Sequence, residues 1–333
     1  MQKKYTFAFL LPALFLGACH SGTQQQTNTE PNETLTAQVA PVFSADSAFA
    51  FTQAQVDFGP RIPSTDAHAR CATYLQNKLT AFGGQVFVQS APVKTYDGKQ
   101  HQLKNIIAAF YPEKKQRVLI TAHWDARPFS DQDPDPANHK KPFDAANDGA
   151  SGVAVILEMA RQIQQKAPEV GVDFILWDIE DYGAANDTTP HESTWCIGSQ
   201  YWAKNQPVKG YKPLYAINLD MVGGANAQFA MDALSRQYAP QLVQKVWSLA
   251  DELGYSSYFI NQNSGQIIDD HYWINQAGIP AIDIVHYTGD DGYGQFYMNW
   301  HTQFDNMANI DRNALKATGQ VLLELIYREK SSV

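Results

Sequence analysis

Hydrophobic and polar residues follow two different periods along the chain, and each period predicts one kind of element. Helical spacing is found in segments at residues 46–59, 65–83, 149–165, 196–205, 235–253 and 312–328. Short apolar runs typical of strands occupy residues 84–91, 103–111, 117–124, 171–178, 214–222 and 280–285. Because strands alternate with helices, we predict an α/β fold: a single domain with a central, mostly parallel (mixed) twisted sheet and helices on both faces.

The N-terminus has a different pattern, in which two lysines precede an apolar run at residues 5–15. This run is too short to span a bilayer, which takes about 20 residues. It is followed by "LGAC", residues 16–19, which resembles the lipobox of bacterial lipoproteins. We therefore expect residues 1–18 to be a lipoprotein signal peptide and Cys19 to carry the lipid. An ordinary secretory peptide or a buried helix is the alternative.

Residues 19–42 are polar and rich in threonine and glutamine, and they show neither period. Such a composition is typical of a flexible linker. We expect a lipid-anchored tether here and a catalytic domain in residues 43–333. The protein would then lie in the bacterial cell envelope, in the periplasm or at the outer membrane, attached to the membrane through its N-terminal lipid. The leaflet that holds the lipid is open.

The composition is that of an acidic globular protein. Of the 333 residues, 44% are hydrophobic, which is enough for a sizeable core, and the net charge is -9. An acidic chain lacks the basic face that nucleic-acid binding needs, so we expect no nucleic-acid partner. Cys71 and Cys196 remain besides the lipidated cysteine; whether they pair is open, as is the oligomeric state.

One stretch, "FILWDIEDYG" at residues 174–183, places three carboxylates directly after an apolar strand: Asp178, Glu180 and Asp181. A carboxylate is costly to bury unless a cation or a proton partner meets it there. Two interpretations follow. Either the strand enters a solvated acidic loop, or the acids line a site at the carboxyl end of the sheet, where α/β proteins bind ligands.

Imidazole and carboxylate groups recur at four other strand ends or loops. They are His123 and Asp125 in "AHWDARP", Asp148 in "ANDGASG", Asp220 in "NLDMVGG" and His301 in "NWHTQFDN". A single residue of this kind is usually structural. Several sites that all supply histidine or carboxylate match the ligand set of a catalytic zinc ion.

Together and in this order, the motifs resemble the zinc aminopeptidase family and, within it, the glutaminyl-peptide cyclotransferases (glutaminyl cyclases). The motifs are "FGPRIPST", "AHWD", "ANDGASG", "WDIEDYG", "NLDMVG", "DDHYWINQAGIPAIDI" and "WHTQFDN". The resemblance extends from about residue 58 to the C-terminus. It implies an enzyme with the zinc aminopeptidase-like fold.

The resemblance implies one zinc ion per chain, bound by Asp148, Asp181 and His301, with Glu180 as the general acid/base. Asp181 departs from many relatives, including the animal cyclases, which have glutamate at this position. The shorter carboxylate must bring its backbone closer to reach a Zn–O distance of about 2.0–2.2 Å.

The resemblance allows two alternative roles for the remaining histidine and carboxylate residues. His123 and Asp220 occupy positions that hold a second zinc in the two-metal aminopeptidases. In the cyclases Asp220 belongs instead to an acidic network with Asp269, which makes both of them catalytic residues. His123 and Asp125 are then either ligands of a second metal or residues that support the first site. Asp178 is interpreted as supporting or structural.

Two tryptophans favour the cyclase. Trp300, in "NWHT", looks like the tryptophan of the cyclase "WHT" motif, where aminopeptidases more often have tyrosine. Trp195, in "STWCIGSQYW", is a second candidate wall of the substrate pocket. Core packing is the alternative for both. An aromatic pocket would exclude the water that an aminopeptidase needs.

The resemblance therefore implies cyclisation of the N-terminal glutamine of peptides and proteins to pyroglutamate, with release of ammonia. The first alternative is a dizinc aminopeptidase, which would carry two zinc ions and remove N-terminal residues. The second is an inactive, peptidase-like binding lipoprotein, and the presence of Glu180 argues against it. Residues 130–144 are expected to form a surface loop near the site, and a role as a lid is open.

Overall fold

The computed structural model describes residues 39–185, 190–289 and 296–331. The predicted signal peptide 1–18, Cys19 and most of the predicted tether lie outside the described residues. Within the described residues, no helix combines the length and the apolar character needed to cross a membrane.

A six-stranded mixed sheet forms the centre of the domain, with the strand order β1-β2-β4-β3-β5-β8. These strands are β1 Gln85–Lys94, β2 Gln100–Phe110, β3 Arg117–His123, β4 Gly171–Trp177, β5 Ala216–Asp220 and β8 Ala281–Val285. β4, β3, β5 and β8 are parallel, whereas β2 is antiparallel to both of its neighbours. The prediction of a mostly parallel, mixed sheet is therefore confirmed.

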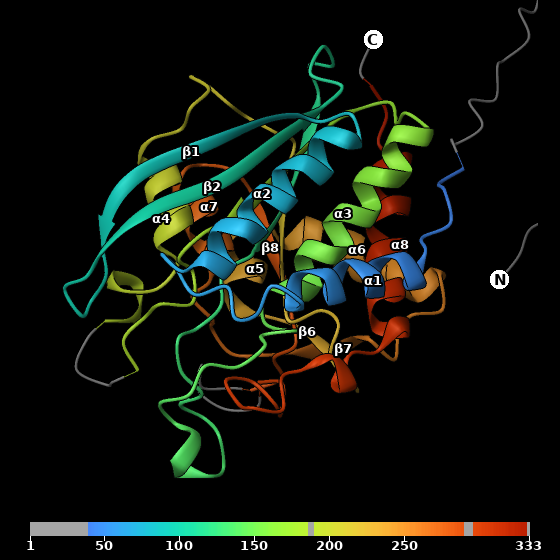
Figure 1. Cartoon of the computed structure of the whole chain (residues 1–333). Coiled ribbons are helices and arrows are strands. Elements are labelled where there is room, and N and C mark those ends of the chain that lie inside the picture. Colours follow the sequence, from blue (N-terminus) through green and yellow to red (C-terminus); the bar gives the residue numbers. More distant parts are fainter. Residues whose placement is uncertain (1–38, 186–189, 290–295, 332–333) are drawn as a thin grey trace, which may run out of the picture. The chain divides into compact units, whose positions relative to one another are not determined.

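Helices cover both faces of this sheet, as predicted (Figure 1). They are α1 Ala45–Val56, α2 Asp66–Ala81, α3 Ala150–Gln165, α4 Ile197–Lys204, α5 Ala233–Tyr238, α6 Pro240–Glu252, α7 Asp270–Gln276 and α8 Arg312–Arg328. The larger hydrophobic core lies between the sheet and α1, α2, α3, α6 and α8, and a smaller core lies under α4 and α7. Both faces of the central strands are buried, and this explains why they read as continuous apolar runs.

The segment 235–253 was predicted as one helix, and this prediction is wrong. The structure has two helices, α5 and α6, which meet at Pro240. Proline has no backbone N–H to donate and biases the residue before it away from the helical conformation, and Ala239 has φ -139° and ψ 54°. Pro240 instead starts α6, where the missing donor is not needed.

Three short elements had no counterpart in the sequence patterns. They are α7 and the strands β6 Phe229–Met231 and β7 Phe259–Asn263, which pair with each other in a second sheet. Each is too short to show a period.

The parallel arrangement brings the functional candidates to one edge of the sheet. β3 ends at His123, β5 ends at Asp220, and β4 ends just before Asp178. α3 packs closely behind them because Gly152 has no side chain: a Cβ there would lie 2.7 Å from the carbonyl oxygen of Leu219.

Candidate active site

Three predicted zinc ligands lie together at the carboxyl edge of the sheet. His301 Nε2 is 3.0 Å from Asp181 Oδ1 and 3.4 Å from Asp148 Oδ2. All three side chains are buried, and one ligand atom from each lies within 4.8 Å of the others. Neither Asp148 Oδ2 nor His301 Nε2 has a hydrogen-bond partner. One imidazole nitrogen and two carboxylate oxygens fit a catalytic zinc site that keeps a position open.

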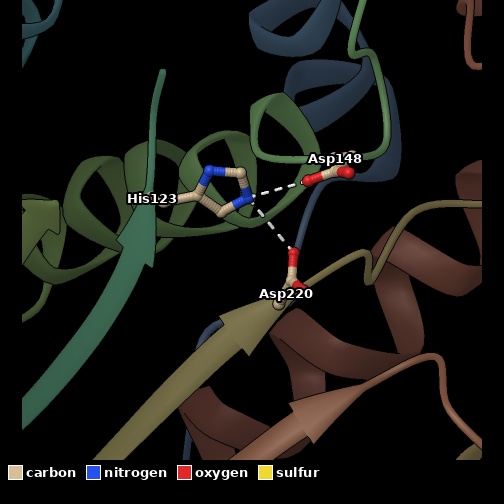
Figure 2. Close-up of side chains that lie close together, drawn as sticks. All are labelled: His123, Asp148 and Asp220. Carbon is tan, nitrogen blue, oxygen red and sulfur yellow. Dashed lines mark hydrogen bonds and ion pairs between the residues drawn. The ribbon is translucent and has the colours of Figure 1, made fainter. Parts of the chain in front are cut away.

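A second group shares Asp148 with the first. His123 Nε2 lies 3.0 Å from Asp148 Oδ1 and 3.2 Å from Asp220 Oδ1 (Figure 2). Their ligand atoms also satisfy the spacing of a metal group. The structure therefore brings together the five residues for which the resemblance implies metal-binding positions.

The shifted pKa values of the buried groups are those expected of a cation-binding site. Burial alone would lower the pKa of His301, but Asp181, Asp131 and Asp148 raise it to about 10. Burial, together with Asp148, raises the pKa of Asp181 to about 6, and burial raises that of Asp220 to about 7. A cation bound among these groups would balance the buried negative charge.

A pair of residues that sequence reasoning missed positions the ligands. Asp131 Oδ1 lies 3.1 Å from His301 Nδ1, on the far side of the imidazole from the metal group. Arg127 donates to both oxygens of Asp131, at 2.9 and 2.8 Å, and its backbone N–H donates to Asp181 Oδ2 at 3.1 Å. Such partners fix the tautomer and orientation of a ligating histidine. Asp131 belongs to the loop 130–144, so this loop reaches the site through a positioning contact.

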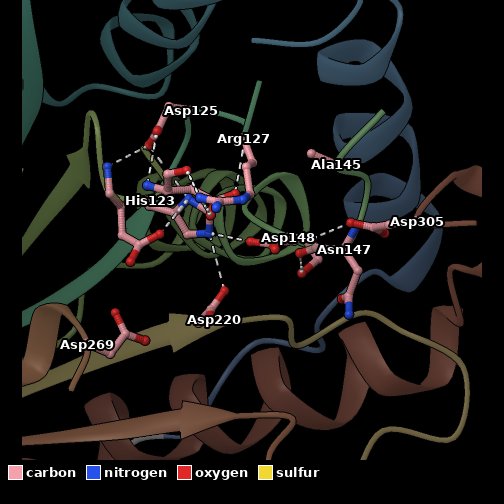
Figure 3. A network of polar contacts seen from close by, with 12 residues as sticks. His123, Asp125, Arg127, Ala145, Asn147, Asp148, Asp220, Asp269 and Asp305 are labelled. Carbon is pink, nitrogen blue, oxygen red and sulfur yellow. Dashed lines mark hydrogen bonds and ion pairs between the residues drawn. The ribbon is translucent and has the colours of Figure 1, made fainter. Parts of the chain in front are cut away.

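Two buried carboxylates hold the backbone that carries the ligands (Figure 3). Asp125 accepts hydrogen bonds from the N–H groups of Glu180 and Asp181, at 3.1 and 3.2 Å. Asp305 accepts from the N–H groups of Asn147 and Asp148, at 2.8 and 3.0 Å. Asp125 is in none of the metal groups, so its position suits the supporting role. Asp305 was missed, although it lies in the quoted motif "WHTQFDN".

The three acids of the stretch "FILWDIEDYG" at residues 174–183 have different partners. Asp181 joins the metal group, whereas Asp178 Oδ1 lies 2.8 Å from Nε2 of the buried His68 and its Oδ2 accepts from the N–H of Lys104 at 2.7 Å. Asp178 therefore ties the strand end to neighbouring elements. Ile179 between them has φ 56°, a left-handed conformation that is strained for a β-branched residue and turns the chain sharply.

Glu180 lies beside His123 of the second group and directly precedes Asp181 of the first group in the sequence. Its Oε2 is 3.8 Å from His123 Nδ1, and its Oε1 accepts a hydrogen bond from the thiol of Cys196 at 3.3 Å. Burial raises the pKa of Glu180 well above its ordinary value; His123 opposes this rise and Asp269 adds to it. The side chain keeps 13% of its surface exposed, so it can exchange protons with a bound molecule.

Both predicted pocket tryptophans stack on His301. The ring centroid of Trp300 is 3.9 Å from that of His301, and the centroid of Trp195 is 6.0 Å away with an interplanar angle of 4°. The guanidinium of Arg127 lies 4.6 Å from the Trp195 ring. His301 itself has φ 54°, another left-handed residue at the site. The two cysteines in the described part of the chain, Cys71 and Cys196, are free and buried.

The chain shares fold and sequence with one family of known proteins. The model of peptidase family M28 matches residues 105–326. A Zn-dependent exopeptidase from Parabacteroides distasonis and the glutaminyl cyclase of Tannerella forsythia each share 50% identity and a TM-score of 0.83, over 87% of this chain and 100% of theirs. The glutaminyl cyclase of Bacteroides thetaiotaomicron shares 46% identity and a TM-score of 0.84, over 88% of this chain and 100% of that one.

Curated proteins of both activities are more distant relatives. Aminopeptidase YwaD of Bacillus subtilis is 26% identical over 67% of this chain, and the glutaminyl-peptide cyclotransferase of Bos taurus is 23% identical over 66%. The matched regions span 44% and 64% of the lengths of these two relatives.

Proposed function

The chain belongs to peptidase family M28, and from this premise we propose that it is a zinc-dependent glutaminyl-peptide cyclotransferase. It converts the N-terminal glutamine of peptides and proteins to pyroglutamate and releases ammonia. The similarity to solved glutaminyl cyclases at 46–50% identity, over their full length, supports this proposal.

The observation that carries the proposal is the stacking of Trp195 and Trp300 on His301. An aminopeptidase needs a water molecule at its metal, whereas a cyclase brings its own nucleophile. Two large aromatic rings against a candidate ligand make an apolar wall that favours the attached amine over water. Trp195 is only 7% exposed, so this wall is held firmly by its surroundings.

Besides the metal ion, the reaction needs two things from the protein: a fixed orientation of the N-terminal glutamine and a group that transfers protons. The α-amine and the γ-carboxamide belong to one residue, and well-oriented intramolecular reactions reach effective molarities of about 10⁵–10⁸ M. Asp148, Asp181 and His301 would hold zinc, which when bound polarises the γ-carbonyl as a Lewis acid. The free α-amine has a pKa of about 7.7–8.0, so much of it is protonated near neutral pH.

Glu180 is placed to move the proton that this reaction must transfer. It takes a proton from the α-amine and delivers one to the departing ammonia. Its raised pKa suits a group that must hold the proton between these two events. Asp220 and Asp269 are proposed to orient the amide nitrogen of the glutamine through hydrogen bonds.

The dizinc aminopeptidase is the second candidate, because the group of His123, Asp148 and Asp220 is complete. We propose that this group holds no catalytic second ion and that His123 supports Asp148 and Asp220. An inactive binding protein is disfavoured, since Glu180 and the zinc group lie side by side.

The fate of the first residue separates these functions. Peptides that differ only in Gln, Leu or Asn at position one are incubated with the enzyme and analysed by mass spectrometry. We expect only the Gln peptide to change, and to lose the mass of one ammonia molecule. The Leu peptide has no electrophile for its amine, and the Asn peptide would have to close a strained four-membered ring. Release of free leucine, with no loss of ammonia from the Gln peptide, would contradict the cyclase and support the aminopeptidase.

We also propose that Cys19 anchors the protein by a lipid in the bacterial cell envelope, and the motif "LGAC" supports this. The side chain of Gln320 accepts from the N–H of Phe43 and donates to the carbonyl of Pro41, so α8 holds the chain at the C-terminal end of the proposed tether 19–42. Cys19→Ser should move the protein from the membrane fraction to the soluble fraction of the envelope. An unchanged distribution would contradict the anchor.

A further inference from the structure

A third cluster of ligand atoms lies on the other side of Glu180. One ligand atom each from Glu180, Cys196 and Asp269 lie within 4.8 Å of one another. Cys196 and Asp269 are buried, and Glu180 provides the exposed edge. The proposed reaction uses the two carboxylates but has no use for the thiol.

The carboxylate of Asp269 in this cluster has fewer hydrogen-bond donors than it can accept. Asp269 is only 5% exposed, and no N–H group donates to its Oδ2. The carboxyl of the fully buried Asp283 lies beside it, and burial, followed by the charge of Asp269, raises the pKa of Asp283 well above the ordinary value. The neighbouring Asp270 is fully buried, and burial followed by the charge of Asp269 raises its pKa well above the ordinary value. The imidazole near Glu180 belongs to His123, whose Nε2 is taken by Asp148 and Asp220. A cation beside Asp269 would relieve this excess of negative charge.

The thiol is held rigidly against the carboxylate. Cys196 caps the start of α4 with φ 57°, and its N–H donates to the carbonyl oxygen of Glu180 at 2.9 Å. The backbones of Cys196 and Glu180 are thus joined, and the thiol also donates to the Glu180 carboxylate. With Zn–S of about 2.3 Å and Zn–O of about 2.1 Å, tetrahedral coordination places sulfur and oxygen roughly 3.6 Å apart. The observed separation of Sγ and Oε1 is 3.3 Å.

We propose that Glu180, Cys196 and Asp269 form an inhibitory site for a second divalent cation of the zinc type. One thiolate and two carboxylates are a ligand set that zinc and the softer cadmium ion accept. On binding, the cation replaces the thiol proton, which is released to solvent, and a metal–sulfur bond forms. Glu180 is then a ligand and can no longer accept the proton of the substrate amine. The inhibition rests on the proposed function, whereas the binding of the cation does not.

The test uses the holoenzyme with its catalytic zinc in place. Excess Zn²⁺ is titrated into the cyclase assay, and the concentration for half inhibition is measured relative to the activity of each variant without added metal. We expect Cys196→Ser to raise this concentration at least tenfold. Cys71→Ser is the matched control, since Cys71 is the other buried free cysteine in the described part of the chain, and it should behave as the wild type.

A spectroscopic readout makes the test independent of activity. Cd²⁺ bound by a thiolate gives a charge-transfer band in the ultraviolet, and the zinc group of Asp148, Asp181 and His301 has no sulfur to produce one. We expect the band in the wild type and in Cys71→Ser, and its loss in Cys196→Ser. Absence of the band in the wild type would overturn the proposal.

Two further outcomes are informative. Zinc inhibition that persists in Cys196→Ser but disappears in His123→Ala would assign the inhibitory ion to the group of Asp148 and Asp220, and would overturn the proposal. A cadmium–thiolate band that requires Cys196, in a protein without cyclase activity, would support the cation site and contradict only the proposed function. The two failures are thus distinguishable.

Discussion

Replacing Asp131 by asparagine tests whether the loop 130–144 acts on the metal site. Asp131→Asn removes the negative charge that faces His301 Nδ1 at 3.1 Å but leaves an amide oxygen that can still accept its hydrogen bond. The orientation of the imidazole should survive while its basicity falls. We expect weaker zinc binding and slower turnover in a correctly folded protein.

The contacts of Asp131 set the size of this effect. At an effective dielectric constant of about 20, a unit charge 3.1 Å from the imidazole is worth roughly 5 kcal/mol. Arg127 binds both oxygens of Asp131, at 2.9 and 2.8 Å, and cancels most of that charge. We therefore expect a loss of about 10–100-fold in zinc affinity, or about 1.4–2.7 kcal/mol, as is typical of carboxylates behind a ligating histidine.

Zinc affinity is measured by competition with a chromophoric chelator, and kcat/KM is measured on a Gln peptide with saturating zinc. Asp135→Asn is the matched control: it makes the same chemical change in the same loop, but Asp135 is exposed and only accepts from the N–H of Ala137 at 3.0 Å. The control should bind zinc like the wild type. If Asp131→Asn binds zinc within twofold of Asp135→Asn, the positioning role is wrong.

Three other predictions follow from the site. Glu180→Gln keeps the size of the side chain but removes the base, so it should retain zinc and lose about 10²–10⁴-fold in turnover; loss of zinc on metal analysis would make Glu180 a ligand. Metal analysis of the wild type should give one tightly bound zinc per chain, unchanged in His123→Ala, whereas two ions reduced to one by this change would favour the aminopeptidase. The third concerns pH: burial raises the pKa of both Asp220 and Asp305 to about 7, and that of His301 is raised to about 10. A group whose pKa is raised on folding stabilises the folded state at pH values below its pKa in the unfolded chain, and this stability is lost as the pH rises through the folded-state pKa. The melting temperature of chelator-treated protein should therefore fall from pH 4.5 to 8. Added zinc should remove this dependence on pH.

The sequence was most informative where function coincides with a local pattern. His123 and Asp220 are the last residues of β3 and β5, so the end of an apolar run located each of them. Because the strands are parallel, their ends must meet, and the grouping of distant residues followed from the fold class alone. The break at Pro240 was also a local signal, but the helical period on both sides of it outweighed the proline.

The supporting residues could not be found in this way, because their partners are far away in sequence and lie in loops. Asp305 binds the backbone N–H of Asp148, which lies 157 positions earlier. Asp131 meets His301 only because the loop 130–144 folds back on the segment after residue 300, where Gln303 donates to Asp133 and Ser130. Loops carry no period, so the side chains that make such contacts look like ordinary solvated residues.

The motif that contains the proposed catalytic acid Glu180 also leaves the space that the Trp195 ring occupies. Gly183 ends the stretch "WDIEDYG", and a Cβ at this position would lie 2.0 Å from the Trp195 ring. Any side chain there would push Trp195 away from His301, on which it stacks. The two activities of this family differ in the nucleophile, so the residues that decide between them are those that admit or exclude water. A glycine two positions after Asp181 allows Trp195 to pack against the ligand segment. We propose that this packing helps to make a peptidase-type zinc site suitable for a substrate that carries its own amine.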